Sequence, residues 1–192
     1  MVTGGGSGIG RCTAHELASL GADLALVGRK MEKLETVKAE IESTCSVKIS
    51  LHSCDIREED RVKETIADIL VAHGKIDHLI NNAGGQFPSP LNMISGKGFE
   101  TVVRNNLTGG FLVAREVFNQ HMMLQLGKKD MSITNIIADM WNGMPGMGHS
   151  GAARAGMLNF SETAANEWAP VRVNAVAPGF IASSGMDTYP EP

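Results

Sequence analysis

Five glycines crowd one short stretch of the chain, in a pattern suited to holding a phosphate. The stretch reads Thr3-Gly4-Gly5-Gly6-Ser7-Gly8-Ile9-Gly10, after the apolar Val2 and before a helical pattern that begins at Arg11. Glycine leaves no Cβ in the way of a ligand, and the N–H groups of such a turn converge with the positive end of the following helix. We predict a phosphate-binding loop that uses Gly4, Gly6, Ser7, Gly8, Ile9 and Gly10. The alternative is a flexible glycine linker.

Two cations follow the next predicted strand. Arg29 and Lys30 stand after Gly28, where folds that bind NAD place an acidic residue for the ribose hydroxyls. A guanidinium and an ammonium would instead attract a 2′-phosphate. The pair favours NADP over NAD, and the alternative is a solvated start of a helix.

Two further strand ends complete the predicted cofactor site. Asp55 and Ile56 follow the third strand. The Asp55 carboxylate could accept a hydrogen bond from an adenine amino group or could cap the helix behind it, and the residues alone do not decide between these roles. After the fourth strand, Asn82-Ala83-Gly84 is small enough for a ligand to approach closely.

Asn106 interrupts the apolar stripe of a long predicted helix. A buried amide that lacks hydrogen bonds costs roughly 1–3 kcal/mol. Asn106 is therefore either a satisfied core residue or part of a polar site.

Alternating strand and helix patterns must position these residues. The strands are predicted at 2–3, 23–28, 47–53, 76–80, 131–137 and 171–177, and the helices from 11 onward and at 31–43, 60–73, 99–123 and 151–168. This order indicates an α/β fold with a doubly wound parallel sheet of the Rossmann type, and residues 1–192 form one domain. Both ends look incomplete, because such a fold needs a longer first strand and a further helix and strand after Pro178-Gly179.

Composition limits the classes of partner and compartment. The chain has 192 residues and a net charge of -4, which argues against nucleic acid as a partner. We see no membrane span and no signal peptide. The cysteines at 12, 45 and 54 lack the spacing of a metal site, so we predict no metal and a cytoplasmic location. A peroxisomal location is the alternative, since the C-terminal end looks incomplete.

Four motifs together resemble the short-chain dehydrogenase/reductase family. They are the glycine loop, Asn81-Asn82-Ala83-Gly84, Asn106-Leu107-Thr108-Gly109 and the stretch from Asn174 to Gly179, and the resemblance runs from residue 2 to about residue 185. It implies a nicotinamide cofactor held also by Pro178, Gly179 and Ile181. It also implies a homodimer or homotetramer formed through the long helices, with apolar surface left by Phe111, Phe118, Phe160 and Trp168.

Two segments resemble one branch of that family more closely. Residues 81–87 and 149–156 are similar to the trans-2-enoyl-CoA reductases, and more loosely to the 2,4-dienoyl-CoA reductases. This similarity implies an acyl-CoA substrate and a role in fatty acid metabolism. The glycine-rich loop at 143–148 would then face the substrate.

The catalytic residues depart from the family pattern. The family's tyrosine falls at Ser150, its lysine at Arg154 and its serine near Ala138. By resemblance, Asn106 holds a water beside the catalytic residues, and Asp139 stands near a tyrosine of the dienoyl-CoA reductases. Candidate acids are Asp139, His149 and Tyr189, although a histidine at a helix start is commonly a cap or packing residue.

Proton demand separates the possible reactions. Oxidation of an alcohol needs a base for the hydroxyl proton, and an arginine cannot serve as one. Reduction of a 2-enoyl thioester needs mainly stabilisation of charge on the thioester oxygen, which Ser150 could supply while Arg154 orients the nicotinamide ribose. We therefore predict an NADPH-dependent enoyl-CoA reductase. The alternatives are an NAD(P)-dependent dehydrogenase of terpenoid or other long-chain alcohols, and a cofactor-binding protein without turnover.

Overall fold

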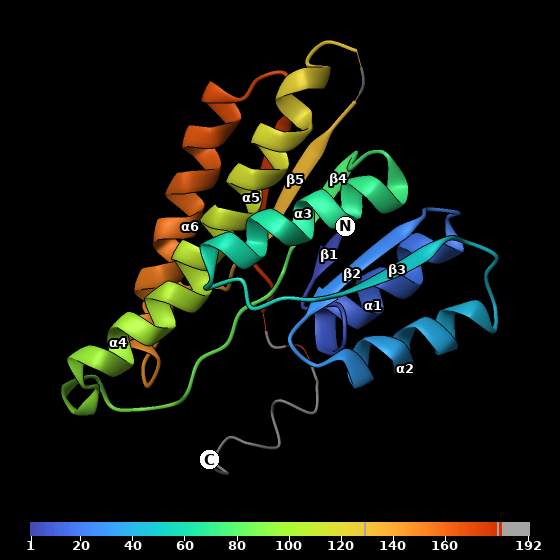
Figure 1. Ribbon diagram of the computed structural model, residues 1–192. Helices are drawn as coiled ribbons and strands as arrows, with labels where there is room; N and C mark the ends of the chain where they lie inside the picture. The colour runs from blue at the N-terminus through green and yellow to red at the C-terminus, as the bar shows by residue number, and fades with distance from the viewer. Residues whose placement is uncertain (129, 180, 182–192) are drawn as a thin grey trace.

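Strands and helices alternate along the chain and build one sheet with helices on both sides (Figure 1). The computed structural model describes residues 1–128, 130–179 and 181. Its strands are β1 (Val2–Thr3), β2 (Leu24–Gly28), β3 (Ile49–Ser53), β4 (His78–Asn81), β5 (Ser132–Ile136) and β6 (Arg172–Val176). Its α-helices are α1 (Gly8–Ser19), α2 (Met31–Glu42), α3 (Glu59–His73), α4 (Gly96–Val103), α5 (Gly109–Gln120) and α6 (Gly148–Glu167).

The sheet has the topology of a doubly wound fold, as predicted. All neighbouring strands are parallel, in the order β3-β2-β1-β4-β5-β6. The order reverses between β1 and β4, so the loops that follow these two strands border a crevice at the carboxyl edge of the sheet. Ligands of such folds bind in that crevice.

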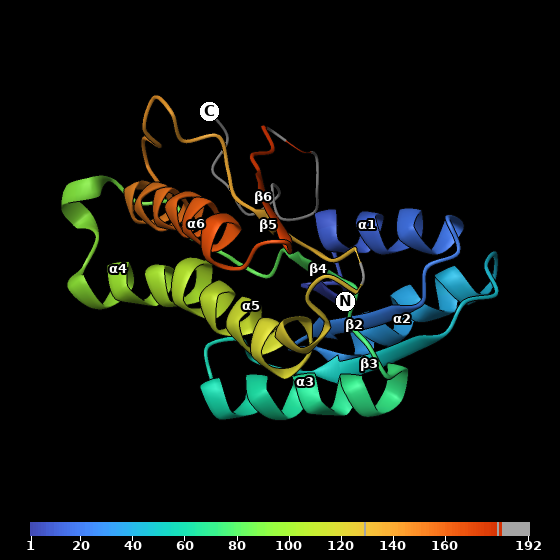
Figure 2. The same ribbon diagram turned by 90° about the horizontal axis from the view of Figure 1, so that it is seen from above.

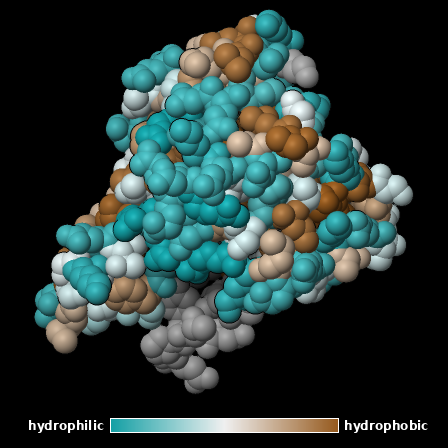
Figure 3. Space-filling view, in the orientation of Figure 1, coloured by the Kyte–Doolittle hydropathy of each residue, from teal (hydrophilic) through white to brown (hydrophobic). Residues whose placement is uncertain are grey.

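Two apolar cores hold the helices against the sheet. Alternate residues of β2 point to opposite faces: Leu24 and Leu26 pack with α1 and α2, whereas Ala25 and Val27 pack with α3, α5 and α6. Figure 2 shows these two layers of helices on opposite sides of the sheet, with α1 and α2 in one layer and α3, α5 and α6 in the other. Hydrophilic side chains cover most of the outer side of α3 (Figure 3), although Val71 near its end is exposed. No helix in the described residues is long and apolar enough to cross a membrane.

The prediction of a single long helix over 99–123 is wrong. Three pieces replace it: α4, a π-helical turn (Arg104–Thr108) and α5, followed by a short 3-10 turn (Met122–Gln125). The Gly109 N–H bonds to the Arg104 carbonyl, which inserts one extra residue into the turn. Helix α6 also begins earlier than predicted, at Gly148, and so includes Ser150 in its first turn.

The four aromatic residues predicted to leave apolar surface instead pack on one another. Phe118 is buried and stacks on Trp168 with ring centroids 4.5 Å apart. Phe160 meets Trp168 and Phe111 edge to face, at 5.7 Å in each case. Phe111, Phe160 and Trp168 nevertheless stay half-buried, so part of the predicted apolar surface remains.

Buried amides tie α5 and α6 to the middle of the sheet. The Asn81 side chain donates to the Gly110 carbonyl at 2.8 Å and to the Asn135 carbonyl oxygen at 3.0 Å. Asn135 in turn donates to Ser161 of α6 at 2.9 Å. Asn81 and Asn135 are thus hydrogen-bonded amides, and the network fixes α6 on the sheet without leaving either amide unpaired.

A separate cluster of two histidines joins β3 to the end of α3. The Ser50 hydroxyl lies 2.8 Å from Nε2 of His52 and 2.8 Å from Nε2 of His73. Burial lowers the pKa of both histidines. The neighbouring Lys48 lowers the pKa of His73 further, whereas Asp68 opposes the shift at His52.

This cluster predicts a loss of stability in mild acid. Because the folded pKa values lie below the ordinary value, the unfolded state takes up these protons first, so stability is full above about pH 6.5 and falls as the pH drops through the folded pKa values. Urea unfolding of the parent and of the His52→Gln/His73→Gln double variant between pH 5 and 8 checks this, and the variant should have the flatter profile. Equal slopes would show that the two histidines do not carry the effect.

Candidate active site

The glycine loop is shaped by close contacts that exclude side chains. Gly4 and Gly8 have φ values of +66° and +52°, which favour glycine. A Cβ on Gly10 would overlap the carbonyl oxygen of Gly4 and lie 2.7 Å from the Asn82 side-chain nitrogen. The loop therefore turns directly into α1, whose first N–H groups face the crevice.

Thr3 joins this loop to the end of β4. Its hydroxyl accepts hydrogen bonds from the backbone N–H groups of Asn82 and Ala83, each at 2.9 Å. The Asn82 side chain donates to the Thr3 carbonyl at 3.1 Å. Asn82 thus supports the loop from behind, whereas the predicted ligand contacts Ala83 and Gly84 line a pocket.

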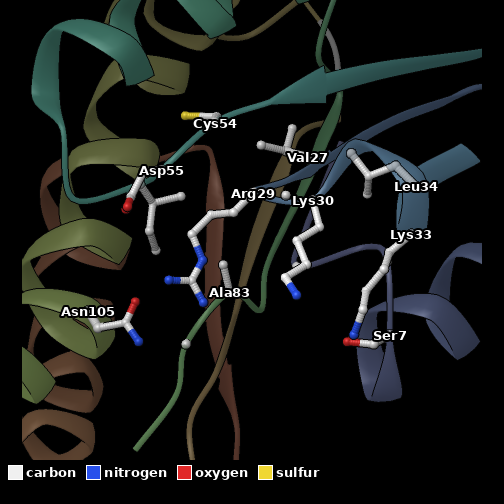
Figure 4. A pocket seen from close by; sticks show the side chains of 15 residues that line it. Ser7, Val27, Arg29, Lys30, Lys33, Leu34, Cys54, Asp55, Ala83 and Asn105 are labelled. Atoms are coloured by element: carbon white, nitrogen blue, oxygen red, sulfur yellow. The ribbon is translucent and has the colours of Figure 1, made fainter.

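The cationic pocket lies between the glycine loop, β2, β3 and β4, with a volume of about 210 Å³. Arg29, Lys30 and Lys33 extend into it, and Lys33 reaches toward Ser7 (Figure 4). The lining also contains most of the residues predicted for one half of the cofactor: Gly4, Gly6, Ser7, Asp55, Ile56, Ala83 and Gly84. The structure brings these together as predicted from the strand ends.

Positive charge dominates the cationic pocket. Within the described residues, none of its three cations forms an ion pair or a side-chain hydrogen bond. The one carboxylate, Asp55, is held by Arg57, whose Nε lies 2.9 Å from Oδ1 and whose backbone N–H lies 3.1 Å from it. The Arg57 guanidinium holds the pKa of Asp55 below its usual range. Asp55 therefore braces the start of the connection to α3, and the pocket is left suited to a phosphate.

A second cavity, of about 610 Å³, lies on the other side of the glycine loop. Ser7, Gly8 and Ile9 line it together with Pro178 and Ile181. Gly179, which was predicted for the same site, is exposed and lines neither cavity.

Arg154 of α6 reaches the backbone that follows β4. Its Nη1 donates to the Ile136 carbonyl at 2.7 Å, and its Nη2 would lie 2.7 Å from a Cβ on Gly84. Its Nε is buried without a partner among the described residues, which also supply no carboxylate to the guanidinium. Burial lowers the pKa of Arg154 to about 10, so the group remains a cation at neutral pH.

Asn106 holds the same backbone in place. Its Oδ1 accepts from the Gly85 N–H at 3.0 Å, and its Nδ2 donates to the carbonyls of Gly85 at 2.7 Å and Val102 at 2.9 Å. The π-helical turn brings the preceding Asn105 to the Gly85 carbonyl as well, at 3.3 Å. Such turns occur frequently at functional sites. All of these hydrogen bonds satisfy the buried amide of Asn106, and they also position the loop at Gly84 and Gly85, called here the cofactor-side loop.

The remaining catalytic candidates lie at the start of α6 and the end of β5. Ser150 and His149 are buried. The Ser150 N–H donates to Nδ1 of His149 at 2.9 Å, which agrees with a capping and packing role for the histidine. Asp139 is exposed, and its N–H bonds to the Pro178 carbonyl at 3.3 Å. Tyr189 lies outside the described residues.

The glycine-rich loop at 143–148 borders an apolar cavity of about 500 Å³ beside α6. Leu91, Met140, Met144 and Pro145 form its larger side chains, and Gly151, Ala152 and Ala155 form its floor. Gly151, which follows Ser150 in the chain, lines this cavity, whereas the buried Ser150 does not.

Sequence reasoning missed three contributors to the site. Lys33 follows Lys30 by three residues on α2, and this spacing was a usable signal for a third cation on one helix face. Thr3 belongs to the recognised loop but was not assigned a contact. Asn105 gave no usable signal, since a regular α-helix would turn it away from Gly85.

Comparison with known proteins agrees with this geometry. The sequence matches the short chain dehydrogenase family over residues 1–191. The chain belongs to this family. It is an oxidoreductase, and its family binds nicotinamide cofactors and acts on small molecules.

Relatives of this enzyme differ in their reactions. A probable 2,4-dienoyl-CoA reductase of Bacillus subtilis is 34% identical over 96% of this chain and 73% of its own length. A citronellol catabolism dehydrogenase of Pseudomonas aeruginosa is 65% identical, with a TM-score of 0.87 over 94% of this chain and 74% of its own. A 3-ketoacyl-(acyl-carrier-protein) reductase of Brucella melitensis complexed with NADH is 26% identical, with a TM-score of 0.89 over 98% and 77%. Among curated relatives the chain spans from 59% to 77% of their length.

Asn106→Ala should destabilise the enzyme and weaken cofactor binding. The substitution removes both hydrogen bonds to Gly85 and leaves its N–H without a partner among the described residues, while Asn105 still bonds to the carbonyl. The expected cost is roughly 1–3 kcal/mol in the free energy of unfolding. Asn119→Ala, at an exposed position of α5, is the matched control and should change this free energy by less than about 0.5 kcal/mol. Urea unfolding and cofactor titration of both variants check the prediction, and equal behaviour of the two would contradict it.

Proposed function

We propose that this enzyme is an NADPH-dependent reductase of the 2,3 double bond of an enoyl-CoA. The observation that carries the proposal is the charged guanidinium of Arg154 beside Gly84 and Gly85, which bonds to a backbone carbonyl but has no carboxylate partner among the described residues. A fixed cation favours negative charge that develops on a nearby oxygen. It cannot accept the proton of an alcohol, because an arginine does not deprotonate under these conditions.

Each residue of the site has a definite task under this proposal. Ser150 donates a hydrogen bond to the thioester oxygen, where charge develops. Arg154 orients the nicotinamide ribose and adds its positive field, and Asn106 positions the backbone at Gly85. Bound NADPH would supply the hydride. The α-carbon proton comes from water or from the exposed Asp139.

The cationic pocket supports NADP(H) as the cofactor. Glycines that leave room for a phosphate and three cations without partners in the described residues fit a 2′-phosphate. The second cavity, with Ile9 and Pro178, suits the rest of the cofactor.

Arg29→Asp should reverse or erase the preference for NADPH over NADH. One charge-assisted contact to a phosphate contributes roughly 1.5–3 kcal/mol, which is about tenfold or more in affinity. Titration by cofactor fluorescence measures both affinities. Lys97→Asp, at an exposed position of α4, changes the net charge equally and should leave the ratio unaltered. Equal affinities of the parent enzyme for the two cofactors would contradict the proposal.

A second candidate is the oxidation of a terpenoid or other long-chain alcohol. The 65% identity to the citronellol catabolism dehydrogenase favours it. The apolar cavity beside α6 suits the hydrocarbon part of either substrate. A third possibility, cofactor binding without turnover, follows from the replacement of tyrosine and lysine by Ser150 and Arg154.

Two substitutions separate these candidates. Ser150→Ala should lower the turnover of a 2-enoyl-CoA by about 10²–10³ with little change in NADPH affinity. Arg154→Lys restores the family's lysine without its tyrosine, so alcohol oxidation should not appear. NADPH consumption and NADP⁺ reduction by the purified full-length protein, against enoyl-CoAs and alcohols, measure both.

The outcomes of this panel are distinct. Parent activity on alcohols alone would replace the proposal by the second candidate, and binding without turnover would replace it by the third. If Ser150→Ala reduces the enoyl substrate at the full rate, another residue stabilises the charge on the thioester oxygen.

The same proposal includes the enzyme's setting and assembly. We place it in fatty acid metabolism, in the cytoplasm or the peroxisome, as a homodimer or homotetramer. The half-buried Phe111, Phe160 and Trp168 on α5 and at the end of α6 provide apolar surface for contact between subunits.

A further inference from the structure

Nε2 of His149 is a buried ring nitrogen without a hydrogen-bond partner in the part of the chain that the structure describes. The residue is fully buried in the first turn of α6. The Ser150 N–H, which also bonds to the Met147 carbonyl at 2.9 Å, donates to its Nδ1 at 2.9 Å. With Nδ1 occupied as an acceptor, the proton of a neutral ring is on Nε2. Nε2 is buried and has no partner among the described residues. An unpaired buried donor is costly enough to require an explanation, such as a ligand.

Phe87 lies directly against this ring. The two ring centroids are 4.6 Å apart, and the rings are almost perpendicular, at 86°. Phe87 belongs to a segment without regular structure that follows Gly84 and Gly85, and its side chain is 40% exposed. The backbone contact from Ser89 N–H to the Gly146 carbonyl, at 2.7 Å, ties this segment to the loop before α6. The histidine therefore lies behind an aromatic ring that reaches solvent, between Gly148 and Gly151, which border the apolar cavity.

The side chains of His149 and Ser150 point in different directions, so they do not donate hydrogen bonds to the same substrate oxygen. Consecutive residues of an α-helix point about 100° apart. Ser150 shares a face with Arg154, one turn further on, whereas His149 points toward Phe87. If Ser150 holds the thioester oxygen, the Nε2–H of His149 is available to another acceptor of the same substrate.

We propose that His149 is a specificity residue that donates a hydrogen bond from Nε2 to the amide carbonyl of the substrate's thiol arm, after the Phe87 ring moves aside. The inference rests on the proposed reduction of an enoyl thioester. In an acyl-CoA, the acceptor that follows the thioester along the chain is the carbonyl oxygen of a secondary amide. A neutral carbonyl matches a neutral N–H donor in apolar surroundings. The enzyme thereby distinguishes thioesters of CoA type from simple alkyl thioesters.

Two short substrates isolate this contact. An enoyl thioester of N-acetylcysteamine contains the amide, and the S-butyl thioester of the same enoyl group lacks it. His149→Asn keeps an acceptor near the position of Nδ1 but removes the donor at Nε2, and His149→Gln keeps a donor that reaches that position. The measurement is kcat/KM of parent and variants for both substrates, with NADPH affinity and thermal stability measured alongside.

The contact predicts a loss confined to one substrate. His149→Asn should lower kcat/KM for the amide-containing thioester by about tenfold or more, as expected for one hydrogen bond, and leave the S-butyl thioester nearly unchanged. His149→Gln should restore the preference for the amide. A loss of equal factor for both substrates, or no loss for either, would overturn the inference and assign the Nε2–H to a buried water or to packing. If the parent reduces neither thioester, the proposed function itself fails.

Discussion

The site depends first on the closeness of Gly10 to the carbonyl of Gly4. Any side chain at residue 10 would overlap that oxygen, and the same side chain would also strike the amide of Asn82. The contact sets how near the first turn of α1 comes to the end of β1, and so where the helix presents its free N–H groups. Both cavities that flank the loop share Gly6 and Ser7 in their walls, and their shapes follow from this one approach. The shape of the predicted phosphate site thus depends on glycines, whose lack of a side chain allows the backbone to approach so closely.

Positive charge reaches the crevice in two physically different ways. The cations of the pocket near β2 face solvent, so water stabilises them and salt screens their pull on a ligand. Arg154 is largely removed from water, and its lowered pKa records the cost of that removal. A buried cation acts strongly over a short range, because little solvent lies between it and its target. The first arrangement suits the capture of a ligand, and the second suits stabilisation of charge on an atom held within the site.

Much of the fold and part of the site could be predicted from the sequence. Residue types at the strand ends sufficed for the glycine loop and for Arg29 and Lys30, because parallel strands bring their carboxyl ends to one edge. The break between α4 and α5 could not be predicted, since a hydrophobic stripe does not reveal a single turn that bonds across five residues. Asn82 was predicted to contact the ligand, and the structure shows that its amide also donates to the carbonyl of Thr3. The contact of Asp55 with Arg57, a neighbour two residues away in the sequence, was also not predicted.

The Thr3 hydroxyl has a consequence for how the chain folds. Its partners Asn82 and Ala83 lie 79 and 80 residues away, and β1 pairs with β4 across a similar interval, through Val2 and Ile80. Contacts of such long range form slowly, because the intervening chain must first be confined. The central strand therefore acquires its second neighbour only after β2, β3 and the helices between them can collapse. We expect the glycine loop to be among the last parts of the site to become rigid, even though it precedes the other parts of the site in the sequence.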